Sequence, residues 1–100
     1  MKLDELYQII CDRRDHPSTG SYTSYLFSRG EDEIIKKVGE EAIEVVLAAK
    51  GQGNERLVSE VADLAYHVLV LLVARRLLPV DIEDELDLRH RKKTMGNLPD

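Results

Sequence analysis

The sequence predicts an all-α domain of four to five helices around a central antiparallel helical hairpin. Two long segments, 31–50 and 55–78, contain no proline and are rich in apolar residues; in the first these residues follow the 3.6-residue period of a helix. The connection at 51–54 is short and contains two glycines, which favour the left-handed geometry that commonly ends a helix. A connection this short makes the two helices antiparallel neighbours.

Shorter elements are expected on both sides of the hairpin. Apolar residues at helical spacing predict an amphipathic helix over 2–14, which the segment 16–20 breaks with Pro17 and Gly20. Segment 21–27 has strand-like composition but no partner strand, so we interpret it as a short helix or turn. Pro79 is expected to end the second long helix. A final polar helix is expected over 81–93, with Asp81 as its cap or first-turn acid.

Length and composition indicate one small domain. A chain of 100 residues, 43% of them hydrophobic, is long enough for one core and too short for two, so residues 1–100 are expected to form a single domain. Chains of this size bury only about two-thirds of their surface on folding. We therefore expect dimerisation to complete the core.

Charge and cysteine content exclude several classes of protein. The net charge of −5 disfavours a non-specific nucleic-acid binder. Cys11 is the single cysteine, so there is no internal disulfide and no zinc-type spacing. The N-terminus lacks the uninterrupted apolar stretch of a signal peptide, and the apolar segment 61–78 is interrupted by Asp63, His67 and two arginines, which argues against a membrane span. We expect a cytoplasmic protein.

Acidic residues occupy unexpected positions on the two long helices. Projected at about 100° per residue, Glu41 and Glu44 fall in a stripe that borders or enters the apolar face of the first helix. Glu60 and Asp63 form a similar stripe on the second, with His67 one turn beyond. Because the helices are antiparallel neighbours, these four carboxylates can converge at one level. Charged residues are rarely buried unless they are paired or bind a metal.

Four converging carboxylates favour a divalent metal. Like charges in a low-dielectric groove repel and would protonate without a compensating cation. Ligation by oxygen alone favours Mg²⁺ or Mn²⁺ over zinc, and Mg²⁺ usually leaves positions for substrate phosphates. The alternative is that the acids are solvated or form i,i+4 pairs such as Lys36 with Glu40 and Lys37 with Glu41.

The acidic pattern also resembles a known motif. Residues 40–44, EEAIE, followed after 15 residues by EVAD at 60–63, match the EExxE…ExxD motif of the MazG superfamily of all-α nucleotide pyrophosphohydrolases. Segments around this motif are similar to those of the phosphoribosyl-ATP pyrophosphatase family. The similar segments are Ser21-Tyr22-Thr23, residues 36–42, Ala48-Ala49-Lys50, residues 60–67 and residues 85–90.

The resemblance implies a fold, a reaction and an assembly. It implies a MazG-like helical bundle that hydrolyses phosphoribosyl-ATP to phosphoribosyl-AMP and pyrophosphate, the second step of histidine biosynthesis. It also implies Mg²⁺ as the required metal and a homodimer that buries its central helices. Because the fused forms carry a cyclohydrolase domain with zinc-binding cysteines, the single cysteine here predicts the stand-alone form. Two alternatives are a house-cleaning nucleoside triphosphate pyrophosphatase and a non-enzymatic helical dimerisation module.

The motif also implies roles for individual residues. Glu41, Glu44, Glu60 and Asp63 would be the metal ligands, and Glu40 would bind a second ion, orient a water or remain a solvated partner of a lysine. His67 would hydrogen-bond a ligating carboxylate or serve as a core residue. The candidate substrate-binding residues, each of which could instead be structural or solvated, are Lys36, Lys37, Lys50, His67 and Arg89.

Overall fold

Five helices and no strands make up residues 1–92, the part of the chain that the computed structural model describes. The helices are α1 (Leu3–Asp15), α2 (Tyr22–Arg29), α3 (Glu31–Gly51), α4 (Asn54–Ala74) and α5 (Pro79–Lys92). The all-α class and the central hairpin are therefore confirmed. Lys93, with which the expected last helix ended, and residues 94–100 lie outside the described part.

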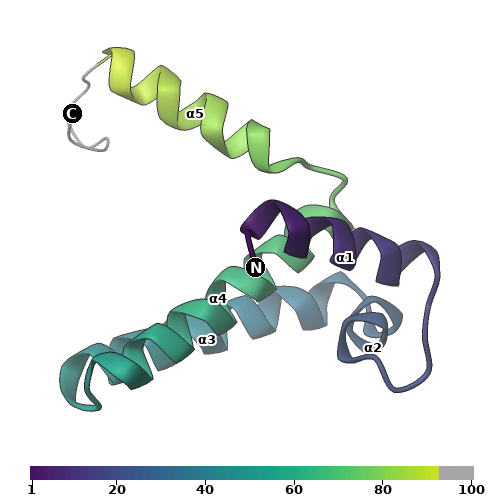
Figure 1. Ribbon diagram of the computed structural model, residues 1–100, viewed down its shortest axis with the longest axis horizontal. Coiled ribbons are helices and arrows are strands. Elements are labelled where there is room, and N and C mark those ends of the chain that lie inside the picture. Colours follow the sequence, from purple (N-terminus) through teal and green to yellow (C-terminus); the bar gives the residue numbers. More distant parts are fainter. Residues whose placement is uncertain (93–100) are drawn as a thin grey trace.

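The α3–α4 hairpin is the longest feature of the molecule, and α1 and α2 pack across one end of it (Figure 1). Gly30 separates α2 from α3 with φ 96°, and Gly53 precedes α4 with φ 87°. Both values lie in the left-handed region that favours glycine. Gly51, expected to share this role, is instead the last residue of α3.

The ambiguous segment 21–27 is helical. Ser21 caps α2, because its hydroxyl oxygen accepts a hydrogen bond from the backbone N–H of Ser24 at 3.1 Å. Leu26 is the buried residue of α2 and joins the core formed by α1, α3 and α4. That core lies at the α1–α2 end of the hairpin, and its fully buried side chains are Ile10, Leu26, Ile34, Val70 and Val73.

The second long helix ends earlier than the sequence predicts. α4 stops at Ala74, and Arg76 adopts a left-handed φ of 57°. Pro79 begins α5 rather than ending α4, a position that suits its fixed φ. Asp81 is the first-turn acid expected, and its carboxylate accepts a hydrogen bond from the N–H of Leu78 at 2.8 Å.

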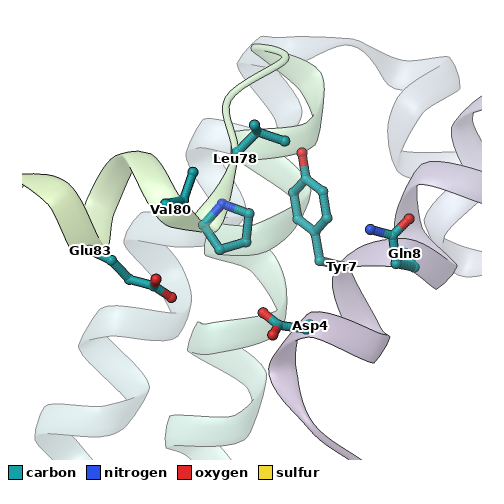
Figure 2. A pocket seen from close by; sticks show the side chains of 7 residues that line it. Asp4, Tyr7, Gln8, Leu78, Val80 and Glu83 are labelled. Carbon is teal, nitrogen blue, oxygen red and sulfur yellow. The ribbon is translucent and has the colours of Figure 1, made fainter.

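The α4–α5 junction is tied to α1 by a buried tyrosine. Tyr7 points from α1 toward this junction (Figure 2), and its hydroxyl donates to the main-chain oxygen of Leu77 at 2.6 Å. Beyond the junction, α5 extends away from the other four helices (Figure 1). The orientation of α5 is therefore set at its first turn.

By length and composition α4 could span a membrane, which is weak evidence because core helices of soluble proteins share these properties. The helix carries Glu60, Asp63 and His67, and it supplies Val70 and Val73 to the core. These features identify α4 as the central helix of the bundle.

Candidate metal centre

The hairpin brings three of the four predicted ligands together. One carboxylate oxygen each of Glu41, Glu60 and Asp63 can be chosen so that all three lie within 4.8 Å of one another. Glu41 comes from the middle of α3, and the other two come from successive turns of α4. The short connection makes α3 and α4 antiparallel, and this places Glu41 opposite Glu60 and Asp63, as predicted.

Burial differs among the three acids. Glu60 is 4% exposed, Glu41 is partly buried and Asp63 is open to solvent. A ligand set with one wall buried and one side open leaves room for a substrate phosphate. The cluster thus has the form of an accessible site at the surface of the hairpin.

Two cations already lie against these acids. The guanidinium of Arg56 contacts Glu60 at 2.7 Å, and the ammonium of Lys37 lies 3.5 Å from Glu41 and 3.8 Å from Glu40. The pairing of Lys37 with Glu41 is the one that the solvated alternative anticipated, whereas Lys36 pairs with Glu33 instead of Glu40. Lys37 and Arg56 therefore offset part of the negative charge.

Lys37 stays charged in this setting. Burial works against its ammonium, but neighbouring groups, among them the carboxylates of Glu41 and Glu40, outweigh this, and the pKa of Lys37 is raised. An ammonium has three donors, so contact with the two glutamates leaves capacity for a phosphate oxygen.

Glu44 and Glu40 lie beside the three-carboxylate cluster. Together with Lys37, Glu41 and Ile43 they line an open hollow of about 350 Å³ on α3. Glu44 lies one turn beyond Glu41 on the same face of α3, but it is not among the three carboxylates that come together. Glu40 is more exposed and contacts Lys37.

The donor set fits a hard cation. All the groups are carboxylate oxygens, which Mg²⁺ and Mn²⁺ prefer. Two oxygens on opposite sides of Mg²⁺ lie about 4.2 Å apart, twice the usual ligand distance. The three oxygens lie within 4.8 Å of one another, so the carboxylates would move closer together to ligate one ion.

His67 lies next to the cluster, but it does not contact a carboxylate. Its Nδ1 donates to the main-chain oxygen of Asp63 at 2.7 Å, and its Nε2 lies 3.1 Å from the hydroxyl of Tyr22. The expected hydrogen bond to a ligating side chain is therefore replaced by one to the backbone of the same residue. His67 is both buried and adjacent to the site.

The other predicted substrate residues lie elsewhere. Lys36 points to Glu33, Arg89 pairs with Glu85 at 3.7 Å on α5, and Lys50 is exposed in the last turn of α3. Within the described chain no contact joins these three to the carboxylates. Their part in substrate binding stays a prediction.

Arg56 is a residue of the site that was not predicted from the sequence. It lies one helical turn before Glu60, so i,i+4 spacing was the signal available. It contacts the most buried acid of the cluster at 2.7 Å.

Comparison with known proteins gives a consistent result. Residues 3–90 match the model of a family described as phosphoribosyl-ATP pyrophosphohydrolase. A phosphoribosyl-ATP pyrophosphatase of Pelotomaculum thermopropionicum is 54% identical over 90 residues, which cover 90% of this chain and 92% of the relative. One from Clostridium botulinum is 50% identical over 90 residues, covering 90% of this chain and 82% of the relative.

A longer relative contains the same segment. A histidine biosynthesis bifunctional protein of Caldanaerobacter subterraneus is 50% identical over 90 residues, which cover 90% of this chain and 44% of that protein. The similarity therefore covers 90 residues both in the two pyrophosphatases and in the longer bifunctional protein.

Proposed function

The chain belongs to the phosphoribosyl-ATP pyrophosphohydrolase family, and from this premise we propose that it hydrolyses phosphoribosyl-ATP with Mg²⁺ held by Glu41, Glu44, Glu60 and Asp63. The products are phosphoribosyl-AMP and pyrophosphate. Membership of an enzyme family decides against the alternative of a non-enzymatic dimerisation module. The observation that carries the proposal is the convergence of Glu41, Glu60 and Asp63 beside Lys37.

The residues at the cluster divide the chemical work. A water oxygen attacks phosphorus at the α–β anhydride, the bridging P–O bond breaks, pyrophosphate leaves, and a carboxylate of the cluster takes the proton of the water. Bound Mg²⁺ supplies charge neutralisation for the phosphates and the leaving group. Lys37 adds a positive charge at the same edge, and Arg56 holds Glu60 in place.

Hydrolysis of phosphoribosyl-ATP is the direct test. We expect pyrophosphate release in the presence of Mg²⁺, its loss after chelation, and its return when Mg²⁺ or Mn²⁺ is added back. A panel of common and damaged nucleoside triphosphates serves as the comparison. A preference for these nucleotides would identify a house-cleaning pyrophosphatase instead, and activity that survives chelation would overturn the metal proposal.

We also propose that the protein is a homodimer. The half of the hairpin beyond α1 and α2 has little cover in the single chain (Figure 1), and large apolar side chains are exposed along it, among them Ile43, Val46, Val58 and Val61. Large exposed apolar side chains gathered on one part of a protein usually mark an interface. Light scattering should give twice the monomer mass of 11.4 kDa, and a monomer at micromolar concentration would contradict the proposal.

A further inference from the structure

Aromatic side chains gather next to the carboxylates. The rings of Tyr22 and Tyr25 stack with centroids 6.3 Å apart, and Tyr66 lies 6.2 Å from Tyr22. The imidazole of His67 meets both Tyr22 and Tyr66 edge to face. Three of the four tyrosines of the protein therefore lie in one cluster formed by α2 and α4.

Tyr22 connects this aromatic cluster to the metal centre. Its hydroxyl lies 3.1 Å from Nε2 of His67, and Nδ1 of the same ring lies 2.7 Å from the main-chain oxygen of Asp63 in the carboxylate cluster. Burial raises the pKa of the phenol, and Lys37 opposes this rise. Lys37 is the residue that pairs with Glu41 of the carboxylate cluster. The aromatic cluster and the metal centre thus share one edge.

The position of Tyr22 is fixed by hydrogen bonds. Nδ1 of His67 donates to the Asp63 carbonyl at 2.7 Å, and Nε2 of the same ring is hydrogen-bonded to the Tyr22 hydroxyl at 3.1 Å. The next residue, Thr23, makes a second hydroxyl contact, with Tyr66. Two adjacent residues of α2 are therefore held by two adjacent residues of α4.

The Tyr22 ring is held by its hydrogen bond to His67, and both Tyr22 and Tyr25 remain open to solvent. Tyr22 is 45% exposed and Tyr25 is 51% exposed. Phenol rings fixed by hydrogen bonds present a flat surface at little cost in conformational entropy. Purine bases stack on such surfaces, as they do in single-stranded nucleic-acid complexes.

We propose that Tyr22 stacks against the purine base of the nucleotide while the phosphates lie at Lys37 and the carboxylates, with Tyr25 extending the platform. This inference rests on the proposed function, because it assigns the base to one side of that site. Tyr22 contacts the substrate, and His67 is a positioning residue that fixes the phenol.

The two reaction products separate base binding from phosphate binding. Phosphoribosyl-AMP carries the purine, whereas pyrophosphate does not, so their inhibition constants report on different parts of the site. We expect Tyr22→Leu to raise the inhibition constant of phosphoribosyl-AMP and the KM of phosphoribosyl-ATP about tenfold, equal to about 1.4 kcal/mol. The inhibition constant of pyrophosphate should stay within about twofold.

Ring-retaining variants are the matched controls. Tyr25→Leu should raise the inhibition constant of phosphoribosyl-AMP, and Tyr25→Phe, which keeps the ring, should raise it less. Ser28→Ala, an exposed position of α2 outside the aromatic cluster, should leave both constants unchanged. Tyr22→Phe keeps the stacking surface and loses only the bond to His67, so its effect should be smaller than that of Tyr22→Leu. Circular dichroism melting of each variant verifies that it is folded, and the exposed Tyr25 provides the test if Tyr22→Leu does not fold.

The possible outcomes are distinct. A parent protein without phosphoribosyl-ATP hydrolysis defeats the proposed function itself. An active parent in which Tyr22→Leu and Tyr25→Leu leave the phosphoribosyl-AMP constant unchanged defeats only the stacking platform. If the inhibition constants of both products rise equally, the substitutions disturb the site as a whole. If an oligomer dissociates while both inhibition constants stay unchanged, the rings belong to a subunit interface. Either result overturns the inference.

Discussion

Replacing Glu60 with glutamine is expected to lower kcat for phosphoribosyl-ATP hydrolysis by about 100-fold or more while the protein stays folded. Glu60 is the most buried acid of the cluster, and one of its carboxylate oxygens lies within 4.8 Å of an oxygen of Glu41 and of Asp63. Glutamine has the same shape but lacks the charge that a hard cation requires. Loss even of residues that only support metal ligands costs about 10–100-fold.

The same substitution should not destabilise the metal-free protein. Glutamine removes one of three like charges that lie within 4.8 Å of one another. Arg56, which pairs with Glu60, is half-exposed and keeps contact with water. We therefore expect an unchanged or slightly higher melting temperature without metal. Activity that falls together with stability would point to misfolding instead of a lost ligand.

Magnesium-dependent stability gives an independent measurement. A ligand at about 100 times its Kd stabilises the folded state by about 2.7 kcal/mol, and Glu60→Gln should lose most of this gain. Glu44→Gln should also lose part of it if Glu44 turns toward the cluster, and an unchanged response would remove Glu44 from the ligand set. Glu55→Gln, an exposed first-turn acid of the same helix, is the matched control and should behave like the parent.

The hairpin and its acids could be predicted because both depend on local periodicity. Apolar spacing defined α3, and antiparallel geometry followed from a connection too short for any other arrangement. Convergence of Glu41, Glu60 and Asp63 then required only the helical repeat of 3.6 residues. These features are encoded within one continuous segment, residues 31–74.

Features that depend on tertiary contacts could not be predicted. The hydrogen bond between Tyr22 and His67 joins residues 45 positions apart, and no periodic pattern indicates which side chain of α2 meets α4. The early end of α4 was hidden because Leu77 and Leu78 continue its apolar composition. The local signal was present in Leu78-Pro79-Val80-Asp81, where proline occupies the first helical position and the acid bonds back to the preceding N–H.

Shortening Leu26 to alanine is expected to lower the free energy of unfolding by about 2–5 kcal/mol. Leu26 is 0% exposed, and it is the buried side chain through which α2 joins the core. Small domains are stable by only about 5–15 kcal/mol, and 1 kcal/mol shifts the melting temperature of a domain this size by about 4–8 °C. A decrease of about 10 °C or more should therefore appear in thermal unfolding.

Ser28→Ala, an exposed position on the same helix, is the control and should change the melting temperature by less than about 2 °C. Because α2 also carries Tyr22, a loosened helix should weaken the binding of phosphoribosyl-AMP at temperatures where Leu26→Ala is still folded. The binding of pyrophosphate should be unaffected. A loss of stability below about 1 kcal/mol would mean that α2 is held mainly by its two hydroxyl contacts with Tyr66 and His67. The core would then matter less for the geometry of the site than those two contacts.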